Sequence, residues 1–355
     1  MRFINNRHLP LCPAAGFSVG MTDAATLPVV DISGLASADA AERRAVAAAL
    51  DRACVRSGFL YVTGAQFDRA LFNRLLATAR AYFAQDSAAK MASYIGRSAN
   101  HSGYVPVGEE RFAGSPVDLK EAFDVNNDYP HDDGRRPLLG PNLWPAMPGF
   151  RDGVLPYYRH LSAIGAQLFG AFATALGLAE DHFAPHLRHP PNQLRLIHYP
   201  HAPEADDRPG IGAHTDYECF TLLFATGPGL QVIAPDGRWI DVPQRPDAMV
   251  MNIGDMMETL SNGRYTATTH RVRKVPDERY SFPLFFTLDY DYVVAPLIPG
   301  DGTRVYPPVA SGAHLFHQTA QTFAYLKERR ARGELVLDDA MPPPGSFGRR
   351  EAAAA

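Results

Sequence analysis

Residues 214–225 read HTDYECFTLLFA, and they decide the expected fold because a strand pattern starts beside two polar residues, His214 and Asp216. In an extended strand residues i and i+2 share a face, so both side chains can reach one ion while Thr215 points away. Further strand-like runs follow, separated by turn residues: LQVIA at 230–234, WIDV at 239–242 and AMVMNIG at 248–254. Such antiparallel strands fold back on themselves and can return the chain to its starting point.

A second histidine, His270 in THRV, closes this series of strands. Two imidazoles and one carboxylate suit Fe(II) and leave neighbouring positions open for substrate and O₂. The run RYSFPLFFTL at 279–288 alternates again, which places Arg279 and Ser281 on one face. An arginine fork with a hydroxyl group is a natural clamp for a carboxylate. The residues therefore predict a metal site with an anion clamp beside it.

The chain resembles the Fe(II)- and 2-oxoglutarate-dependent dioxygenases, specifically the branch that contains isopenicillin N synthase and the plant flavonoid and hormone oxygenases. The resemblance rests on HTDYECFTLL, GLQV, DGRWIDVP, VMNIGDMMETLSNGRYTATTHRV and RYSFPLFF. It also includes LPVVDISGL near residue 27, GFLYVTG near 58, SGYVPVGEE near 102, DLKEAFDV near 118 and GAHLFHQTAQTFAYL near 312. The similarity thus covers roughly residues 27 to 330, and these motifs say little about the substrate.

The resemblance implies an α+β fold, a double-stranded β-helix (a jelly-roll or cupin-like barrel) with flanking helices. It assigns His214, Asp216 and His270 to the metal as catalytic ligands. It assigns Arg279 and Ser281 to the distal carboxylate of 2-oxoglutarate, and Tyr199 in HYP resembles the tyrosine of the plant NYYP motif, whose hydroxyl reaches the same group. The sequence departs from the plant pattern at Ile197, where an asparagine would stand, so one polar contact to the cosubstrate is in doubt.

The implied reaction uses Fe(II), 2-oxoglutarate as cosubstrate and O₂. It hydroxylates, desaturates or cyclises a small molecule, an amino acid or a secondary metabolite, and releases succinate and CO₂. Two alternatives remain open from the residues. An oxidase of the isopenicillin N synthase type retains the Arg-x-Ser pair for its own substrate carboxylate, and zinc accepts the same three ligands in a hydrolase or a non-catalytic barrel.

Family analogy places substrate contacts in the 97–125 loop, in the strand after Asp216 and near the C-terminus. The expected residues are Arg97, His101, Tyr104, Phe123, Glu218 and Phe286. Glu218 shares the ligand face with Asp216 if the strand continues, where it would bind a substrate amine or remain a salt-bridged carboxylate at the rim. Candidates for groups that orient the metal ligands are Thr269, Asn252 and Asp255.

The chain reads as one oxygenase domain over residues 27–335, with the jelly-roll core at about 190–290. We expect residues 1–26 to be a flexible extension, in which residues 1–20 come from a start codon upstream of the native one. We expect residues 336–355 to be loosely ordered. Helical patterns occupy 37–57, with Ser37 or Asp39 as cap, then 66–93, 155–178 and 311–331. Residues 97–150 have loop composition, and strands alternate with turns from 192 to 288.

Composition agrees with this reading. The formal net charge is −4 with a pI near 6.3, and the scattered basic residues indicate neither nucleic acid nor an anionic membrane as a partner. Cys12, Cys54 and Cys219 are widely spaced without a CxxC pair, which favours a reduced cytoplasmic compartment. On a strand Cys219 would face away from Asp216, so we expect a packed thiol rather than a ligand. The oligomeric state is not readable from the sequence.

Overall fold

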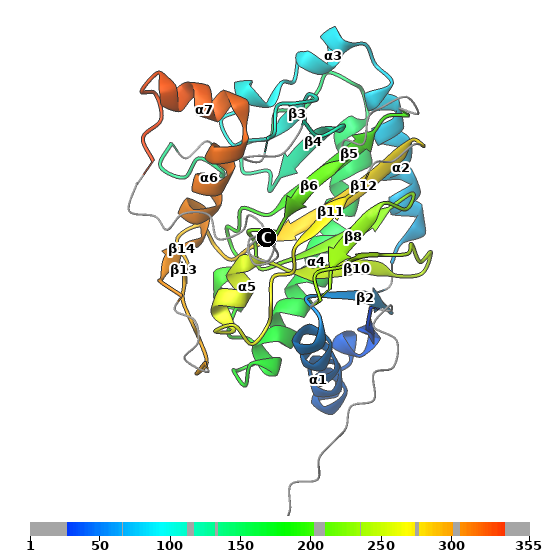
Figure 1. The fold of residues 1–355 in the computed structure, drawn as a ribbon, viewed down its shortest axis with the longest axis vertical. Coiled ribbons are helices and arrows are strands. Elements are labelled where there is room, and N and C mark those ends of the chain that lie inside the picture. Colours follow the sequence, from blue (N-terminus) through cyan, green and yellow to red (C-terminus); the bar gives the residue numbers. More distant parts are fainter. Residues whose placement is uncertain are drawn as a thin grey trace, which may run out of the picture.

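The computed structural model describes residues 27–65, 67–111, 117–131, 134–201, 210–234, 236–273, 277–300 and 306–337. The expected tails at 1–26 and 338–355 lie outside the described residues. Two sheets face one another, and helices cover the outer side of the larger one (Figure 1). This is the jelly-roll α+β architecture that the sequence predicts.

The larger sheet has eight strands in the order β1-β2-β10-β7-β12-β5-β4-β3. Their bounds are β1 Val29–Asp31, β2 Phe59–Thr63, β3 Gly103–Val105, β4 Glu121–Asn126, β5 Gln193–Tyr199, β7 Phe220–Ala225, β10 Met249–Ile253 and β12 Arg279–Phe286. Only β1 and β2 pair in parallel; the other pairs are antiparallel.

The smaller sheet has the order β6-β11-β8-β9 and supplies the other wall of the barrel. Its strands are β6 Ile211–His214, β8 Leu230–Ile233, β9 Trp239–Asp241 and β11 His270–Val272. A separate short pair joins β13 Val293–Val294 to β14 Val309–Ala310. Between β10 and β11 lies the helix α5 Asp255–Leu260, where the sequence predicts only strands and turns.

The four helices before β5 are α1 Ala40–Arg56, α2 Arg69–Phe83, α3 Ser87–Met91 and α4 Phe150–Ala175, with short 3-10 turns at Ser33–Ala36, Ile95–Arg97 and Ala184–His186. Three of them form a layer behind the larger sheet, whereas α3 stands at the top of Figure 1 and has no buried residue. Asp39, one of the two expected caps, accepts from the Ala41 amide and starts α1. Helix α4 begins before its expected start because Gly149, in the left-handed conformation at φ 77°, precedes its first residue.

The expected C-terminal helix is two helices, α6 Ser311–Thr322 and α7 Ala324–Ala331. Phe323 separates them with an extended backbone at φ −85° and ψ 132°. Both helices stand at the side of the barrel in Figure 1, in orange. Residues of α6 and Phe323 reach the cavity between the two sheets.

The expectation of a loop over 97–150 is wrong in part, because β3 and β4 lie within it. Every residue of β4 is buried although its sequence, EAFDVN, is half polar. The polar residues are accommodated by partners: Asp124 opposes Arg195 in the register with β5 and forms an ion pair with it, at 2.9 Å. No helix among the described residues is long and apolar enough to cross a membrane.

Candidate metal centre and its cavity

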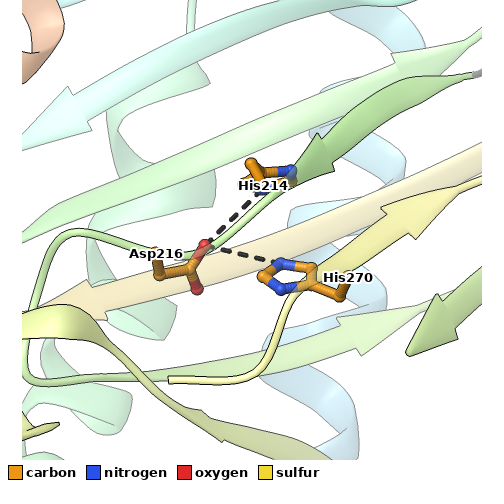
Figure 2. A group of neighbouring side chains, drawn as sticks. All are labelled: His214, Asp216 and His270. Carbon is orange, nitrogen blue, oxygen red and sulfur yellow. Dashed lines mark ion pairs between the residues drawn. The ribbon is translucent and has the colours of Figure 1, made fainter. Parts of the chain in front are cut away.

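Three side chains converge at the open ends of the smaller sheet. His214 ends β6 and His270 begins β11, and the two residues face each other in the register with ring centroids 4.3 Å apart. Asp216 Oδ1 lies 3.6 Å from His214 Nε2 and 3.5 Å from His270 Nε2 (Figure 2). One ligand atom from each residue lies within 4.8 Å of the others. The side chains are therefore placed to hold one ion between them.

The local reason for this placement differs from the expected one. The strand ends at His214, so Asp216 lies in the following loop rather than on the same strand face. Backbone hydrogen bonds fix that loop: the Asp255 amide donates to the Asp216 carbonyl at 2.8 Å, and the Met256 amide donates to the Glu218 carbonyl at 3.1 Å. Helix α5 therefore holds the loop in place from its first turn.

Both histidines present Nε2 to the candidate metal position. His214 Nδ1 lies 2.8 Å from the Gly212 carbonyl, and His270 Nδ1 lies 3.2 Å from the Thr268 carbonyl. A carbonyl only accepts, so in the neutral form of each ring Nδ1 carries the proton and Nε2 keeps its lone pair. Burial, together with His270, lowers the pKa of His214 to about 4. A neutral imidazole is the form that binds a metal.

The two oxygens of Asp216 have different surroundings. Oδ2 accepts from Asn252 Nδ2 at 2.7 Å and from the Thr221 hydroxyl, whereas Oδ1 faces the two histidines. Burial alone would raise the pKa of Asp216, but the nearby His270 holds it below its ordinary value. The carboxylate is thus ionised and oriented to offer one oxygen. Two nitrogen donors and one oxygen donor of this kind fit Fe(II).

Of the three expected orienting residues, only Asn252 contacts the Asp216 carboxylate with its side chain. Asp255 acts through its backbone amide, and the Thr269 carbonyl accepts from the Ile233 amide at 3.0 Å. The sequence reasoning missed Thr221. Its signal was the alternation of FTLLFA, which puts Thr221 and Leu223 on the cavity face of β7.

The expected anion clamp lies in the same cavity on the opposite wall. Arg279 and Tyr199 face each other across β12 and β5, and the guanidinium carbon sits 4.8 Å from the centre of the Tyr199 ring. Ser281 follows on the same face of β12. Arg279 is 1% exposed and donates from Nε to the Gly227 carbonyl at 3.0 Å.

Two buried polar atoms of the clamp, Arg279 Nη1 and the Tyr199 hydroxyl, have no hydrogen-bond partner among the described residues. Burial lowers the pKa of Arg279 and raises that of Tyr199. A buried guanidinium nitrogen without a hydrogen-bond partner is costly, and a bound carboxylate would remove that cost. The donor set therefore fits a dicarboxylate ligand.

Two of the six expected substrate residues line the cavity, His101 and Glu218. His101 is buried with its Nδ1 2.6 Å from the Tyr325 hydroxyl. Burial and the Asp216 charge raise the pKa of Glu218 to about 8. Glu218 lies in the loop after β6, not on a strand.

The other four expected substrate residues lie away from the cavity, and those expectations are corrected. Arg97 is exposed and donates to the Ala92 carbonyl, and the Tyr104 hydroxyl donates to Glu121 at 2.6 Å. The remaining two point to the helix side of the larger sheet: Phe123 packs on Tyr82 and Phe150, and Phe286 stacks on Phe220. Because side chains alternate along a strand, it is Phe285 that lines the cavity.

The sequence reasoning also missed a buried ionic cluster on the cavity wall. Its charged members that line the cavity are Glu110, Lys120 and Arg195. Glu110 pairs with Lys120 at 2.7 Å and with Arg195 at 3.0 Å. The signal for Arg195 was its position four residues before Tyr199, which puts both on one face of β5.

Comparison with known proteins agrees with this geometry. Residues 190–288 match the 2OG-Fe(II) oxygenase superfamily, and residues 27–147 match the N-terminal region described for non-haem dioxygenases in morphine synthesis. The 2-oxoglutarate-Fe(II) type oxidoreductase hxnY of Emericella nidulans is 33% identical over 75% of this chain and 80% of its own. A homoarginine-6-hydroxylase of Arabidopsis thaliana is 32% identical over 85% of this chain and 99% of its own.

A solved structure of a 2OG-Fe(II) oxygenase family protein from Caulobacter crescentus superimposes with a TM-score of 0.73. It is 30% identical and covers 83% of this chain and 98% of its own. The fold, the His-Asp-His group and the relatives agree on Fe(II) and 2-oxoglutarate as cofactors. The chain belongs to the 2OG-Fe(II) oxygenase superfamily and is an Fe(II)- and 2-oxoglutarate-dependent dioxygenase.

Proposed function

We propose that this enzyme hydroxylates, desaturates or cyclises a small molecule, an amino acid or a secondary metabolite, and converts 2-oxoglutarate to succinate and CO₂. The observation that carries the proposal is the presence, in one cavity, of a His-Asp-His group and a buried arginine whose Nη1 has no partner among the described residues. The relatives' names include a homoarginine hydroxylase and other oxidoreductases, which supports a small-molecule substrate.

The proposed roles follow from the contacts. His214, Asp216 and His270 hold the iron, which together with 2-oxoglutarate and O₂ supplies the oxidising power. Asn252 and Thr221 keep one Asp216 oxygen occupied, so that only the other binds the metal. Arg279, Ser281 and Tyr199 bind the distal carboxylate of the cosubstrate, and Ile197 adds an apolar surface beside Ser281, its partner in the register.

Substrate enters the rest of the cavity, where His101 and Glu218 contribute to its wall. Closing residues come from α6 and the turn after it: Leu315, Thr319, Thr322 and Phe323. A wall of this kind excludes water and holds the substrate C–H bond next to the metal position. Cys54 and Cys219 are buried free thiols, which is consistent with the cytoplasm as the proposed location, and Cys12 lies outside the described residues.

The test is stoichiometric. Anaerobic addition of Fe(II) and 2-oxoglutarate is expected to give the weak visible band of an iron chelate. A panel of amino acids and secondary metabolites is then screened for succinate release that depends on the added compound. One oxidised product per succinate supports the proposal; product formed without succinate contradicts it and indicates an oxidase that does not use the cosubstrate.

A further inference from the structure

A chain of side-chain amides fixes the orientation of Gln193 at the end of the cavity. Asn126 Nδ2 donates to the backbone carbonyls of Asn100 and His101, so its Oδ1 must accept. Gln193 Nε2 donates to that Oδ1 at 3.0 Å. All side-chain hydrogen bonds from Gln193 to described residues use Nε2, which leaves Oε1 as an acceptor at the cavity wall.

A second fixed group stands two residues along the same strand. Arg195 donates from Nε to Asp124 at 2.9 Å and from Nη1 to Glu110 at 3.0 Å. Its Nη2 has no partner within the part of the chain that the structure describes, although Arg195 is only 8% exposed. The two carboxylates hold the guanidinium so that Nη2 remains as a donor with a defined position.

Both groups face the cavity because residues 193, 195, 197 and 199 alternate with core residues along β5. Tyr199 belongs to the proposed cosubstrate clamp. Arg195 lies four residues before it, at roughly 3.3 Å per residue, with Ile197 between them. Gln193 and Arg195 therefore form the end of the cavity that 2-oxoglutarate does not need.

We propose that Gln193 and Arg195 bind an amide group of the substrate, with the Gln193 oxygen accepting from its N–H and Arg195 Nη2 donating to its carbonyl oxygen. The proposal rests on the proposed function, because it treats this end of the cavity as the substrate site. A neutral ring amide, in which N–H and C=O point to the same side, is the class of compound that satisfies both groups at once.

The net charge of the groups around Arg195 favours an amide over a carboxylate as the ligand at this end of the cavity. Among the described residues, the cluster around Arg195 contains the carboxylates of Glu110, Asp118 and Asp124 but only two cations, Lys120 and Arg195. Burial raises the pKa of Asp124 to about 6, which leaves it ionised at neutral pH. The cluster has no surplus positive charge with which to offset a further anion. A neutral carbonyl oxygen is therefore the acceptor that fits Nη2.

Four six-membered ring compounds test the amide. We expect δ-valerolactam, which offers both groups, to bind about three to ten times more tightly than cyclohexanone, which lacks the N–H. Piperidine and cyclohexanecarboxylate should bind more weakly still. Dissociation constants are measured by calorimetry on the anaerobic enzyme loaded with Fe(II) and 2-oxoglutarate, and again on the metal-free protein. Tighter binding of cyclohexanecarboxylate, or no lactam binding at millimolar concentration, overturns the proposal.

The variant Gln193→Met keeps the volume and removes the acceptor. It should weaken the binding of δ-valerolactam about three- to tenfold. The dissociation constant of cyclohexanone should stay unchanged, because the ketone needs only Arg195. Gln321→Met, a half-buried glutamine of α6 that does not line this cavity, is the matched control. An equal effect of Gln193→Met on both compounds, or none on either, contradicts the proposal. If the variant fails to fold, the comparison of the four compounds on the wild-type protein still tests the proposal.

Failure of the proposed function gives a different result. If the iron chelate band does not form, the cosubstrate site is wrong, whereas lactam binding to the metal-free protein still reports on Gln193 and Arg195. If the band forms and the lactam does not bind, the oxygenase reading stands and the amide site is wrong.

Discussion

Two arginines each present one unpaired nitrogen, Arg279 Nη1 and Arg195 Nη2, within the described parts of the cavity wall. They differ in their surroundings. Arg195 is held by two carboxylates, whereas Arg279 has a backbone carbonyl and the face of Tyr199 as its contacts. Only Arg279 therefore lacks a countercharge, and this is the physical reason to place the anionic cosubstrate there.

This asymmetry predicts the effect of Arg279→Met. The apparent KM for 2-oxoglutarate should rise at least about thirtyfold, because a charged hydrogen bond to a buried carboxylate contributes about 2 kcal/mol or more. The stability of the ligand-free protein should stay level or increase, since a buried charge without a countercharge is removed. Steady-state kinetics and urea unfolding measure the two effects. Arg273→Met, an exposed arginine after β11, is the control; an unchanged KM would contradict the clamp.

Asp216→Ala removes the single carboxylate of the proposed metal site. We expect activity to be abolished and anaerobic Fe(II) binding to weaken by at least about a hundredfold. Loss of a group that merely orients a metal ligand already lowers metal affinity about ten- to a hundredfold, and loss of the ligand itself should cost at least as much. Asp241→Ala, at an exposed position on β9, should leave both unchanged. Full turnover by Asp216→Ala would remove this residue from the ligand set.

His101 gives the protein a predicted pH dependence. Burial, then Arg195, lowers the pKa of this histidine to about 3, whereas in the unfolded chain it is about 6.5. The unfolded state thus binds more protons below pH 6.5, and stability falls as the pH falls. Between pH 7 and 5 the loss is about 2 kcal/mol from this residue alone.

The measurement compares urea unfolding of the wild type with that of His101→Asn at pH 7 and 5. Asparagine tolerates the left-handed backbone of this position, where φ is 58°. The raised pKa of Asp124 has the opposite effect, because it favours the folded state as the pH falls. This effect is present in both proteins, so the difference between their pH dependences isolates His101. A pH dependence that is the same in both would show that His101 titrates normally.

At the scale of elements, alternation along strands explains why most of the expected site residues lie together, whereas Asp216 reaches the site from the loop after β6. The sequence predicted His214, Asp216, His270, Arg279, Ser281 and Tyr199 as neighbours, and the structure brings all six to one cavity. It did not predict β4, because charged residues in a strand look like loop composition until their partners are known. Asp124 and Arg195 are 71 residues apart in the chain. Their pairing depends on the register between β4 and β5, which cannot be predicted from composition.

Phe286 fits this pattern, since it is a packing residue of β12 against α4. An added Cβ on Gly165 of α4 would overlap the Phe286 ring. Gly165→Ala is therefore expected to destabilise folding by about 1 to 3 kcal/mol, although alanine favours a helix more than glycine does. Gly170→Ala on the same helix, where the nearest atom is 3.3 Å from the added Cβ, should cost less.

A double-mutant cycle makes the test specific. Phe286→Leu gives the added methyl group room, so Gly165→Ala should cost less in that background, by urea unfolding. Equal costs in the two backgrounds would show that the strain lies elsewhere. Iron binding should remain in every variant that folds, because the ring points away from the metal.

At the scale of the whole molecule, α6 and Phe323 close a cavity whose other walls are formed mainly by the two sheets. One buried carboxylate attaches the C-terminal helices: Glu109 accepts from the Tyr325 amide at 2.9 Å and from the Tyr94 hydroxyl at 2.8 Å. The Glu109 carbonyl accepts from the Ala324 amide at 2.8 Å. The segment before β4 and the start of α7 are thus joined at the point where Phe323 enters the cavity.

Glu109→Ala should therefore loosen α7 without unfolding the barrel. It leaves the Tyr325 amide and the Tyr94 hydroxyl without their acceptor, at a local cost of about 1 to 3 kcal/mol. We expect hydrogen exchange to accelerate in peptides from 311–331 and to stay unchanged in β5 and β12. Because we propose that the closing wall contacts substrate rather than cosubstrate, the KM for substrate should rise while that for 2-oxoglutarate does not. Glu328→Ala, on the exposed side of α7, is the control, and equal acceleration across all peptides would mean that Glu109 supports the whole fold instead.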